Sequence, residues 1–399
     1  MTMHATPLRC QKHLFSLPEG HTYLNSAFMG PLPLPVQQAG LQALSARAAP
    51  VGLSPKDFFE PAEHARQLYA RLVNADPERV AFIPHIAHAA AIVAKNLHPQ
   101  PGQNVVLLGD MFPSNVYAWR NWRELGVELR TVPAPALGSP ADHASRAARW
   151  NEAVVQAIDE RTVLVAVEQA HWTDGTLFDL ERIGKRCRAV GAAWVVDATQ
   201  TLGVMPFDVQ ALQPDMLMAH SYKSMLSNYG LGFAVLGERF LHGSPLEESW
   251  LMRSGSEDFA RLVDYVDGYA PGMRRFDTSL RANPLLIHML IAALELLLQW
   301  EPQRTRDYLY GIAREPLERL QGSGFAVGAE NQRSANLFGI TLPLGLTPEH
   351  CRAELQRRRI HVAVRGSAVR ISPHVYNDAQ DLHVLVDALL ELAAPKGSH

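Results

Sequence analysis

Cysteine, net charge and long apolar runs are all scarce in this chain of 399 residues. Its three cysteines (Cys10, Cys187, Cys351) lie far apart and form no CxxC pair, so neither a disulfide framework nor a structural zinc site is expected, and a reducing cytoplasm is the expected location. The formal net charge of −3 argues against nucleic acids and membrane surfaces as partners, because proteins that bind either of them carry an excess of basic residues.

Two further absences narrow the class of protein. No apolar run reaches the roughly 18 to 20 residues of a membrane span, and residues 1–17 lack the continuous apolar core of a secretory signal. His85 and His88 could share a helix face, but no third ligand is near them in sequence, so no metal site is predicted.

What is present is typical of a globular enzyme. Hydrophobic residues make up 47% of the chain and charged residues 19%, and the length favours one large domain plus a smaller one. Short β-branched runs alternate with amphipathic segments up to about residue 275, which predicts an α/β domain with a mainly parallel, doubly wound sheet. The predicted strands are Val80–Ile83, Val105–Leu108, Leu129–Val132, Val163–Glu168, Ala193–Asp197, Met216–Ala219 and Phe233–Leu236.

The pattern changes near residue 275. Two helices, Pro284–Trp300 and Arg306–Leu320, precede shorter strands and helices, which predicts a small α+β C-terminal domain. We therefore expect a large domain over 21–275, and a small domain that comprises 276–399 together with residues 1–20.

Two predicted strands end on charged residues that are unusual in such apolar surroundings. Asp197 ends Ala193–Asp197, and Lys223 follows Met216–Ala219. A lysine in an enclosed site has a lowered pKa and becomes a nucleophile toward an aldehyde. An acid at a neighbouring strand end suits pyridoxal 5′-phosphate (PLP), whose pyridine nitrogen it keeps protonated. For these two residues alone, a turn-capping Asp197 and a solvated Lys223 remain the alternative.

Segments along residues 20–390 resemble the class V aminotransferase family, which includes cysteine desulfurases, kynureninases and isopenicillin N epimerase-like proteins. The lysine region Val195–Leu236 is similar to that of the family, and three further segments follow the family's order. These are the N-terminal Tyr23–Pro33, Phe112–Asn115 with Trp119, and Arg370–Asn377 with Asp381. The resemblance implies a fold-type-I PLP enzyme with a Schiff base on Lys223.

The resemblance also implies roles around the cofactor. Asp197 would pair with the pyridinium nitrogen, Gln200 would lie beside the phenolic oxygen, and Phe112 would stack on the ring; a turn and ordinary core packing are the alternatives for the last two. His171, with Trp172, would face the cofactor as a catalytic residue. The phosphate would bind backbone N–H groups at Ile86 and Ala87, although the family's usual hydroxyl is absent there, with His220 and Tyr222 as side-chain donors.

The resemblance places the substrate and a second subunit at the same site. Arg370, with Asn25, would hold the carboxylate of a small amino acid, because a guanidinium fork matches a carboxylate; a structural salt bridge is the alternative. Trp250 and Asn283 resemble positions that reach into a partner subunit, which implies a homodimer with its active site at the interface. Asn283 could also simply cap the helix that starts at Pro284.

The chain departs from cysteine desulfurases in one segment. The run from His361 to Arg370 leaves no room for their mobile cysteine loop, and Cys351 falls in a predicted helix. We therefore expect a lyase that cleaves a side-chain bond without a catalytic cysteine, with transamination or epimerisation as the second expectation. A non-catalytic PLP-binding regulatory protein is the alternative of another class. A nicotinamide-dependent dehydrogenase is a weaker alternative, because no GxGxxG motif follows an early strand.

Overall fold

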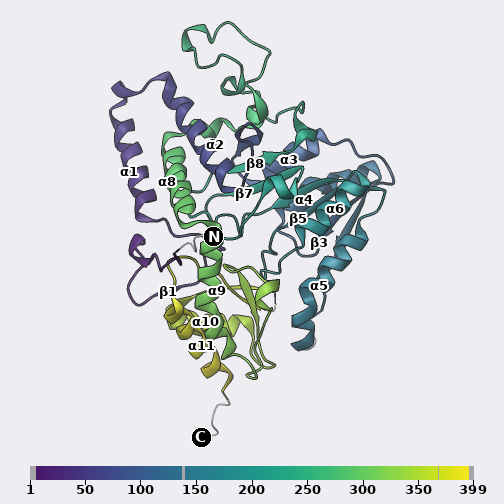
Figure 1. Cartoon of the computed structure of the whole chain (residues 1–399), viewed down its shortest axis with the longest axis vertical. Helices are drawn as coiled ribbons and strands as arrows, with labels where there is room; N and C mark the ends of the chain where they lie inside the picture. Colours follow the sequence, from purple (N-terminus) through teal and green to yellow (C-terminus); the bar gives the residue numbers. More distant parts are fainter. Residues whose placement is uncertain (1–5, 137–139, 367, 395–399) are drawn as a thin grey trace.

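A computed structural model describes residues 6–136, 140–366 and 368–394 of the chain. Its larger part is a seven-stranded sheet in the order β2-β8-β7-β6-β5-β3-β4 (Figure 1). The strands are β2 (Val80–Ile83), β3 (Asn104–Leu108), β4 (Glu128–Val132), β5 (Thr162–Glu168), β6 (Ala193–Asp197), β7 (Met216–His220) and β8 (Gly232–Leu236). Only β8 runs antiparallel to its neighbours, so the predicted mainly parallel sheet is confirmed.

Helices cover both faces of this sheet, as the buried side chains on its central strands require. The helices of this part of the chain are α1 (Leu34–Ala48), which packs on α8 and not on the sheet, α2 (Glu60–Leu72), α3 (Ile86–Asn96), α4 (Ser114–Arg120), α5 (Pro140–Ala157), α6 (Leu180–Val190), α7 (Val209–Leu212) and α8 (Pro284–Trp300). Within the described residues no single helix is long and apolar enough to cross a membrane; only α8 and the helix after it, α9 (Pro302–Glu318), pass that test jointly, with a 70° bend between them.

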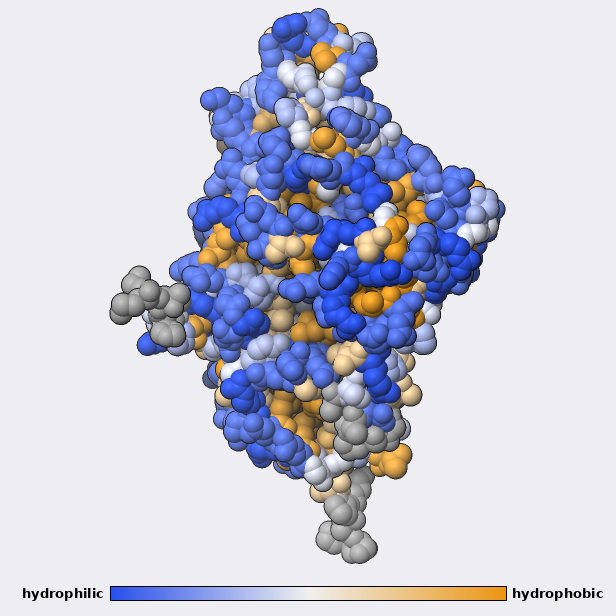
Figure 2. Space-filling view, turned by 45° about the vertical axis from the view of Figure 1, so that its right-hand side comes forward, coloured by the Kyte–Doolittle hydropathy of each residue, from blue (hydrophilic) through white to orange (hydrophobic). Residues whose placement is uncertain are grey.

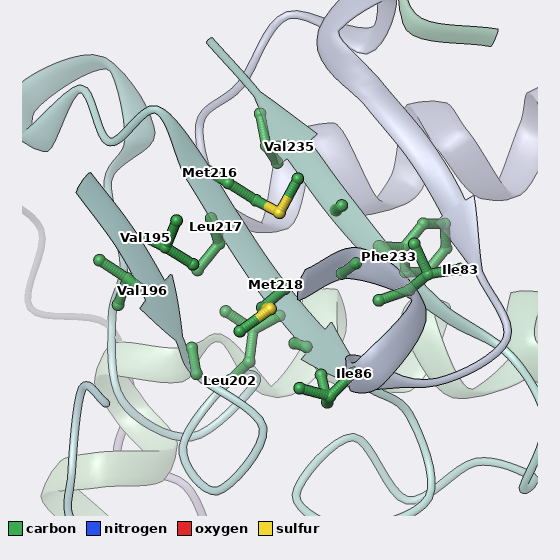
Figure 3. Packing of buried hydrophobic residues seen from close by; sticks show 14 of the residues in the cluster. Ile83, Ile86, Val195, Val196, Leu202, Met216, Leu217, Met218, Phe233 and Val235 are labelled. Carbon is green, nitrogen blue, oxygen red and sulfur yellow. The ribbon is translucent and has the colours of Figure 1, made fainter. Parts of the chain in front are cut away.

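The surface and the interior differ sharply in composition. Hydrophilic residues cover most of the face shown in Figure 2, with smaller hydrophobic patches between them. Inside, Val195, Met216, Met218 and Phe233 from β6, β7 and β8 pack with Ile86 at the start of α3 (Figure 3). This packing fixes where the strands end and where α3 begins, and the candidate site lies at that point.

A second, smaller core lies below the sheet in Figure 1. It is built on the four-stranded antiparallel order β12-β13-β10-β9. Its elements are α9 (Pro302–Glu318), β9 (Ala326–Val327), β10 (Phe338–Thr341), α10 (Pro348–Arg357), β11 (Ile360–His361), β12 (Ala363–Arg365), β13 (Ala368–Ile371) and α11 (Ala379–Ala393). The expected small α+β domain is therefore present.

The border between the two cores differs from the expected one at residue 276. Helix α8 packs on α1 and α2, and its buried Leu290, Leu294 and Leu297 belong to the large core. The sequence alone could not show this, because a helix with apolar residues on nearly every face is compatible with either core. The N-terminal segment also contributes to both: Phe15 packs in the large core, while β1 (Thr22–Tyr23) pairs with β11 of the small domain.

Candidate active site

A pocket of about 200 Å³ lies at the carboxyl ends of β5, β6 and β7, beside the start of α3. The last residues of β5 and β6, Glu168 and Asp197, line it together with Lys223, three residues beyond β7. Carboxyl ends of parallel strands meet at one edge of a sheet, which is where such folds bind ligands. The three ionisable side chains, far apart in sequence, therefore share one cavity.

Lys223 is held rigidly and is almost fully buried. Its neighbour Tyr222 accepts a backbone hydrogen bond of 2.9 Å from Gly30. A Cβ atom at Gly30 would come within 2.3 Å of the Lys223 carbonyl oxygen, so only glycine allows this approach. Burial lowers the pKa of Lys223 to about 8, although Asp197 acts in the opposite direction. The amine is thus partly neutral near physiological pH, as a nucleophile must be.

Asp197 is a buried carboxylate that accepts hydrogen bonds but forms no ion pair with another described residue. Oδ2 accepts from Nδ2 of Asn115 at 2.8 Å, and Oδ1 accepts from the Thr199 backbone N–H at 2.8 Å. A buried carboxylate without a cation at contact distance is costly unless a ligand supplies one. A protonated pyridine nitrogen would meet that need, so this side chain fits PLP.

The donors for a phosphate lie at the other end of the pocket. His85 caps α3, because its Nδ1 accepts from the His88 N–H at 3.1 Å, and Ile86 and Ala87 line the cavity in the first turn. The positive end of a helix dipole favours an anion here. Nε2 of His220 lies 3.1 Å from the Pro84 carbonyl oxygen, while its buried Nδ1 has no partner among the described residues. These groups also fit the cofactor.

Aromatic and amide side chains surround the space between Lys223 and Asp197. The Lys223 amine lies 5.1 Å from the centre of the Phe112 ring, and Trp172 meets that ring edge to face at 5.6 Å. Oε1 of Gln200 is buried and finds no partner among the residues that the structure describes, while its backbone oxygen accepts from Asn336 of the small domain at 2.7 Å. Tyr222 and the more exposed Tyr229 complete the wall.

Arg370 of the small domain, and Asn25 of the N-terminal segment that is bridged to Ser372, lie beside the site without lining the pocket itself. Arg370 is 1% exposed and donates through Nη1 to the Trp172 carbonyl oxygen at 2.9 Å. Its Nε and Nη2 atoms, and Oδ1 of Asn25, are buried without partners in the described structure. Burial, and then Arg365, lower the pKa of Arg370 to about 9. A structural salt bridge does not occupy this guanidinium, which fits the predicted role in binding a carboxylate.

Besides Arg370 and Asn25, three predicted site residues do not line this pocket. His171 is turned away: Nε2 faces the Gly109 carbonyl oxygen at 3.0 Å, Nδ1 faces Thr173 Oγ1 at 2.7 Å, and its ring lies 4.9 Å from that of Trp150. The alternation of side chains along the segment after β5 explains the orientation of His171. Glu168, Ala170 and Trp172 line the cavity, and successive side chains of an extended segment point to opposite sides, so His171 points away from it.

The other two side chains, both predicted to act in a partner's site, have local roles within their own chain. Trp250 packs on Phe58, Phe59 and Phe259. Asn283 caps α8, with Oδ1 accepting from the N–H groups of Leu285 at 3.1 Å and Leu286 at 3.2 Å. This helix start lies beside the loop that carries Lys223, between β7 and β8, since Asn228 of that loop donates to the Leu286 carbonyl oxygen at 2.7 Å.

The sequence reasoning missed Glu168 as a site residue. Its carboxyl accepts from the Phe112 N–H at 3.1 Å and the Trp172 N–H at 2.8 Å, so it holds both aromatic residues in place. Burial first, and then Asp197, raise its pKa to about 8. The signal was available, because Glu168 ends an apolar strand as Asp197 does, and the two are register partners.

All three cysteines lie outside the pocket. Cys187 and Cys351 are fully buried in α6 and α10. The Sγ of Cys10 lies 3.7 Å from the carbonyl oxygens of Tyr376 and Asn377. Burial raises the pKa of Cys187 to about 12 and that of Cys351 to about 11, so neither thiol is a ready nucleophile.

Comparison with known proteins gives consistent matches along the chain. The sequence model of the Aminotransferase class-V family matches residues 23–385. An uncharacterised aminotransferase, YcbU, of Bacillus subtilis is 26% identical over 95% of this chain and 96% of its own. Isopenicillin N epimerase of Streptomyces clavuligerus is 26% identical, over 92% of this chain and 93% of its own. A probable cysteine desulfurase of Methanothermobacter thermautotrophicus is 26% identical, over 94% of this chain and 95% of its own.

Solved structures share the fold. The cysteine desulfurase of Thermococcus onnurineus superimposes with a TM-score of 0.79 at 20% identity, covering 98% of this chain and 99% of that one. The cystine C-S lyase C-DES, solved with cysteine persulfide, superimposes with a TM-score of 0.81 at 19% identity, covering 94% and 98%. The large sheet domain and the small domain are thus arranged as in these proteins.

Proposed function

The chain belongs to the class V aminotransferase family of PLP-dependent enzymes, and on that premise we propose that it is a lyase cleaving a side-chain bond of a small amino acid without a catalytic cysteine. One observation carries the proposal: the pocket gathers Lys223, Asp197 and Glu168, while all three thiols lie elsewhere. A desulfurase needs a thiol that reaches the substrate.

The chain's residues divide the work of holding the cofactor. Asp197 would hold a proton on the pyridine nitrogen, Phe112 would cover the ring, and the start of α3 would bind the phosphate. When bound, PLP supplies an electron sink for charge developing at the substrate Cα. Lys223 would be the covalent anchor of the cofactor, and its Nζ, when free, would be the base that takes the proton from the substrate Cα.

Arg370 would orient the substrate. Its free Nε and Nη2 atoms present a fork to the α-carboxylate, and Asn25 would assist there. Fixing this carboxylate decides which bond at Cα stands perpendicular to the ring, and hence which bond breaks. Transamination or epimerisation is the second candidate, because relatives of those names match nearly the whole chain.

Product analysis tests the reaction. The PLP-loaded protein is incubated with a panel of amino acids, and pyruvate, ammonia and sulfide are measured with and without an added keto acid. A lyase forms product without the keto acid. Product that requires the keto acid, or racemised substrate without elimination, would overturn the lyase assignment.

Two variants sharpen that experiment. In Lys223→Ala, borohydride treatment should add no cofactor mass to the protein, and product formation should fall by about 10³-fold or more, as expected for loss of both anchor and base. A variant with Cys10→Ser, Cys187→Ala and Cys351→Ala should keep its activity once its fold is verified. Loss of activity in that correctly folded variant would restore a cysteine-based mechanism.

A further inference from the structure

Arg365 and Arg370 lie on the same face of the small sheet. Strands β12 and β13 pair antiparallel, with Arg365 opposite Ala368 and Ala363 opposite Arg370. Arg370 is two residues from Ala368, so its side chain points to the same side as that of Arg365. Such diagonal neighbours lie about 7 to 8 Å apart, within reach of each other's long side chains.

The two guanidinium groups also share one aromatic ring. The central carbon of Arg365 lies 5.4 Å from the Trp172 ring centre and that of Arg370 lies 6.0 Å from it. Trp172 lines the Lys223 pocket and also a second cavity of about 410 Å³ beside it. Arg365 lines this second cavity, and Trp172, which both guanidinium groups approach, is the side chain common to the two spaces.

Neither guanidinium is neutralised within the described parts of the chain. The hydrogen bonds of Arg365 and Arg370 go to the carbonyl oxygens of Val364, at 2.7 Å, and Trp172. Burial lowers the pKa of both, and no carboxylate raises either one. Arg146, lining the same second cavity, differs in this respect because Asp174 pairs with it at 2.8 Å.

Two facing cations that no carboxylate compensates are destabilising unless an anionic ligand joins them. Arg370 alone would suffice for an α-carboxylate. The second cavity gives a substrate side chain room to extend toward Arg365, and a further negative charge there would complete the pair.

We propose that Arg365 binds a second anionic group, and that the substrate is a dianionic amino acid whose side chain ends in a carboxylate or a sulfinate. This rests on the proposed function only in taking the ligand to be an amino acid. Arg370 binds the α-carboxylate, Trp172 forms the wall between the two anionic groups, and Arg365 is the residue that sets side-chain specificity.

Binding is measured on the PLP-loaded enzyme by the change in cofactor absorbance as amino acids are titrated. The probes are aspartate with asparagine, glutamate with glutamine, and cysteine sulfinate. The wild type should bind the acid of at least one pair about tenfold more tightly than its amide, or cysteine sulfinate about tenfold more tightly than the two amides. A charge-assisted hydrogen bond predicts a difference of this size. Arg365→Gln should weaken that acid about tenfold and the amides less than about threefold.

Three further variants make the result decisive. Arg365→Lys keeps the charge and should recover part of the preference for the acid, Arg370→Gln should weaken acid and amide alike, and Arg352→Gln, at an exposed position of α10, should change neither. Equal binding of acids and amides by the wild type, or loss of acid preference in Arg352→Gln instead of Arg365→Gln, would overturn the proposal. Acid preference that depends on Arg365 but without any cleaved product would instead count against the proposed lyase reaction alone.

Discussion

Glu168 shows how a single residue can be visible in the sequence and still escape assignment. Lys223 and Asp197 stand out in the sequence because charged residues at the ends of apolar strands are rare, and Glu168 ends β5 in the same manner. It has no counterpart in the segments that resemble the family, so the resemblance implies no role for it. The resemblance does imply a role for His171, but the ring of this residue is turned away from the cavity that its neighbours Ala170 and Trp172 line.

The raised pKa of Glu168 gives a prediction for stability. Its folded pKa of about 8 lies above the usual 4.5, so the folded chain keeps a proton that the unfolded chain has lost between those values. Its contribution to the free energy of unfolding is therefore full below pH 4.5, falls by about 1.4 kcal/mol per pH unit up to about pH 8, and is constant above that.

Urea unfolding of the cofactor-free protein at several pH values between 5 and 8 checks this. In Glu168→Gln the side chain cannot titrate, so the stability advantage of the wild type should shrink across that window. The variant itself is expected to be less stable at pH 5, because the amide NH2 group takes the place of one carboxyl oxygen and cannot accept the Phe112 or Trp172 N–H group that this oxygen binds. A difference that is independent of pH would mean that the folded protein already holds Glu168 ionised.

At the scale of elements, the predicted strands of the large sheet match the structure within about a residue at either end. They are short apolar runs between polar turns, and a fully buried parallel strand leaves little else for such a run to form. The sequence did not show which core α8 joins, because that depends on the partner surface and not on the helix itself.

The start of α8 provides a test at this scale. Asn283 accepts two backbone N–H groups there, so Asn283→Ala should lower the free energy of unfolding by about 1 kcal/mol, while Asn283→Ser should keep most of it. Thermal and urea unfolding measure both. If Asn283→Ser lost PLP affinity at unchanged stability, the side chain would have a second role toward a cofactor, as the resemblance to family members with shared sites implies.

At the scale of the whole molecule, one chain leaves large apolar side chains in solvent. Tyr229 lines the candidate active site and is 64% exposed, and Leu41 and Leu44 on α1 are 60% exposed. A second copy covering such residues would complete the pocket wall as well as the surface, since symmetric pairing is the usual form of assembly. We expect sedimentation equilibrium to give twice the 44.1 kDa mass of the chain.

A mixing experiment asks whether the dimer shares its sites. If Trp250 acts in the partner's pocket, Trp250→Ala and Lys223→Ala are each inactive, and co-expressed chains form mixed dimers with one complete site. Random pairing makes about half of the dimers mixed, so activity should return to about a quarter of the wild-type value. Trp250 already packs on Phe58, Phe59 and Phe259 of its own chain, so an active Trp250→Ala dimer, or a mixture that stays inactive, would limit this tryptophan to that local packing.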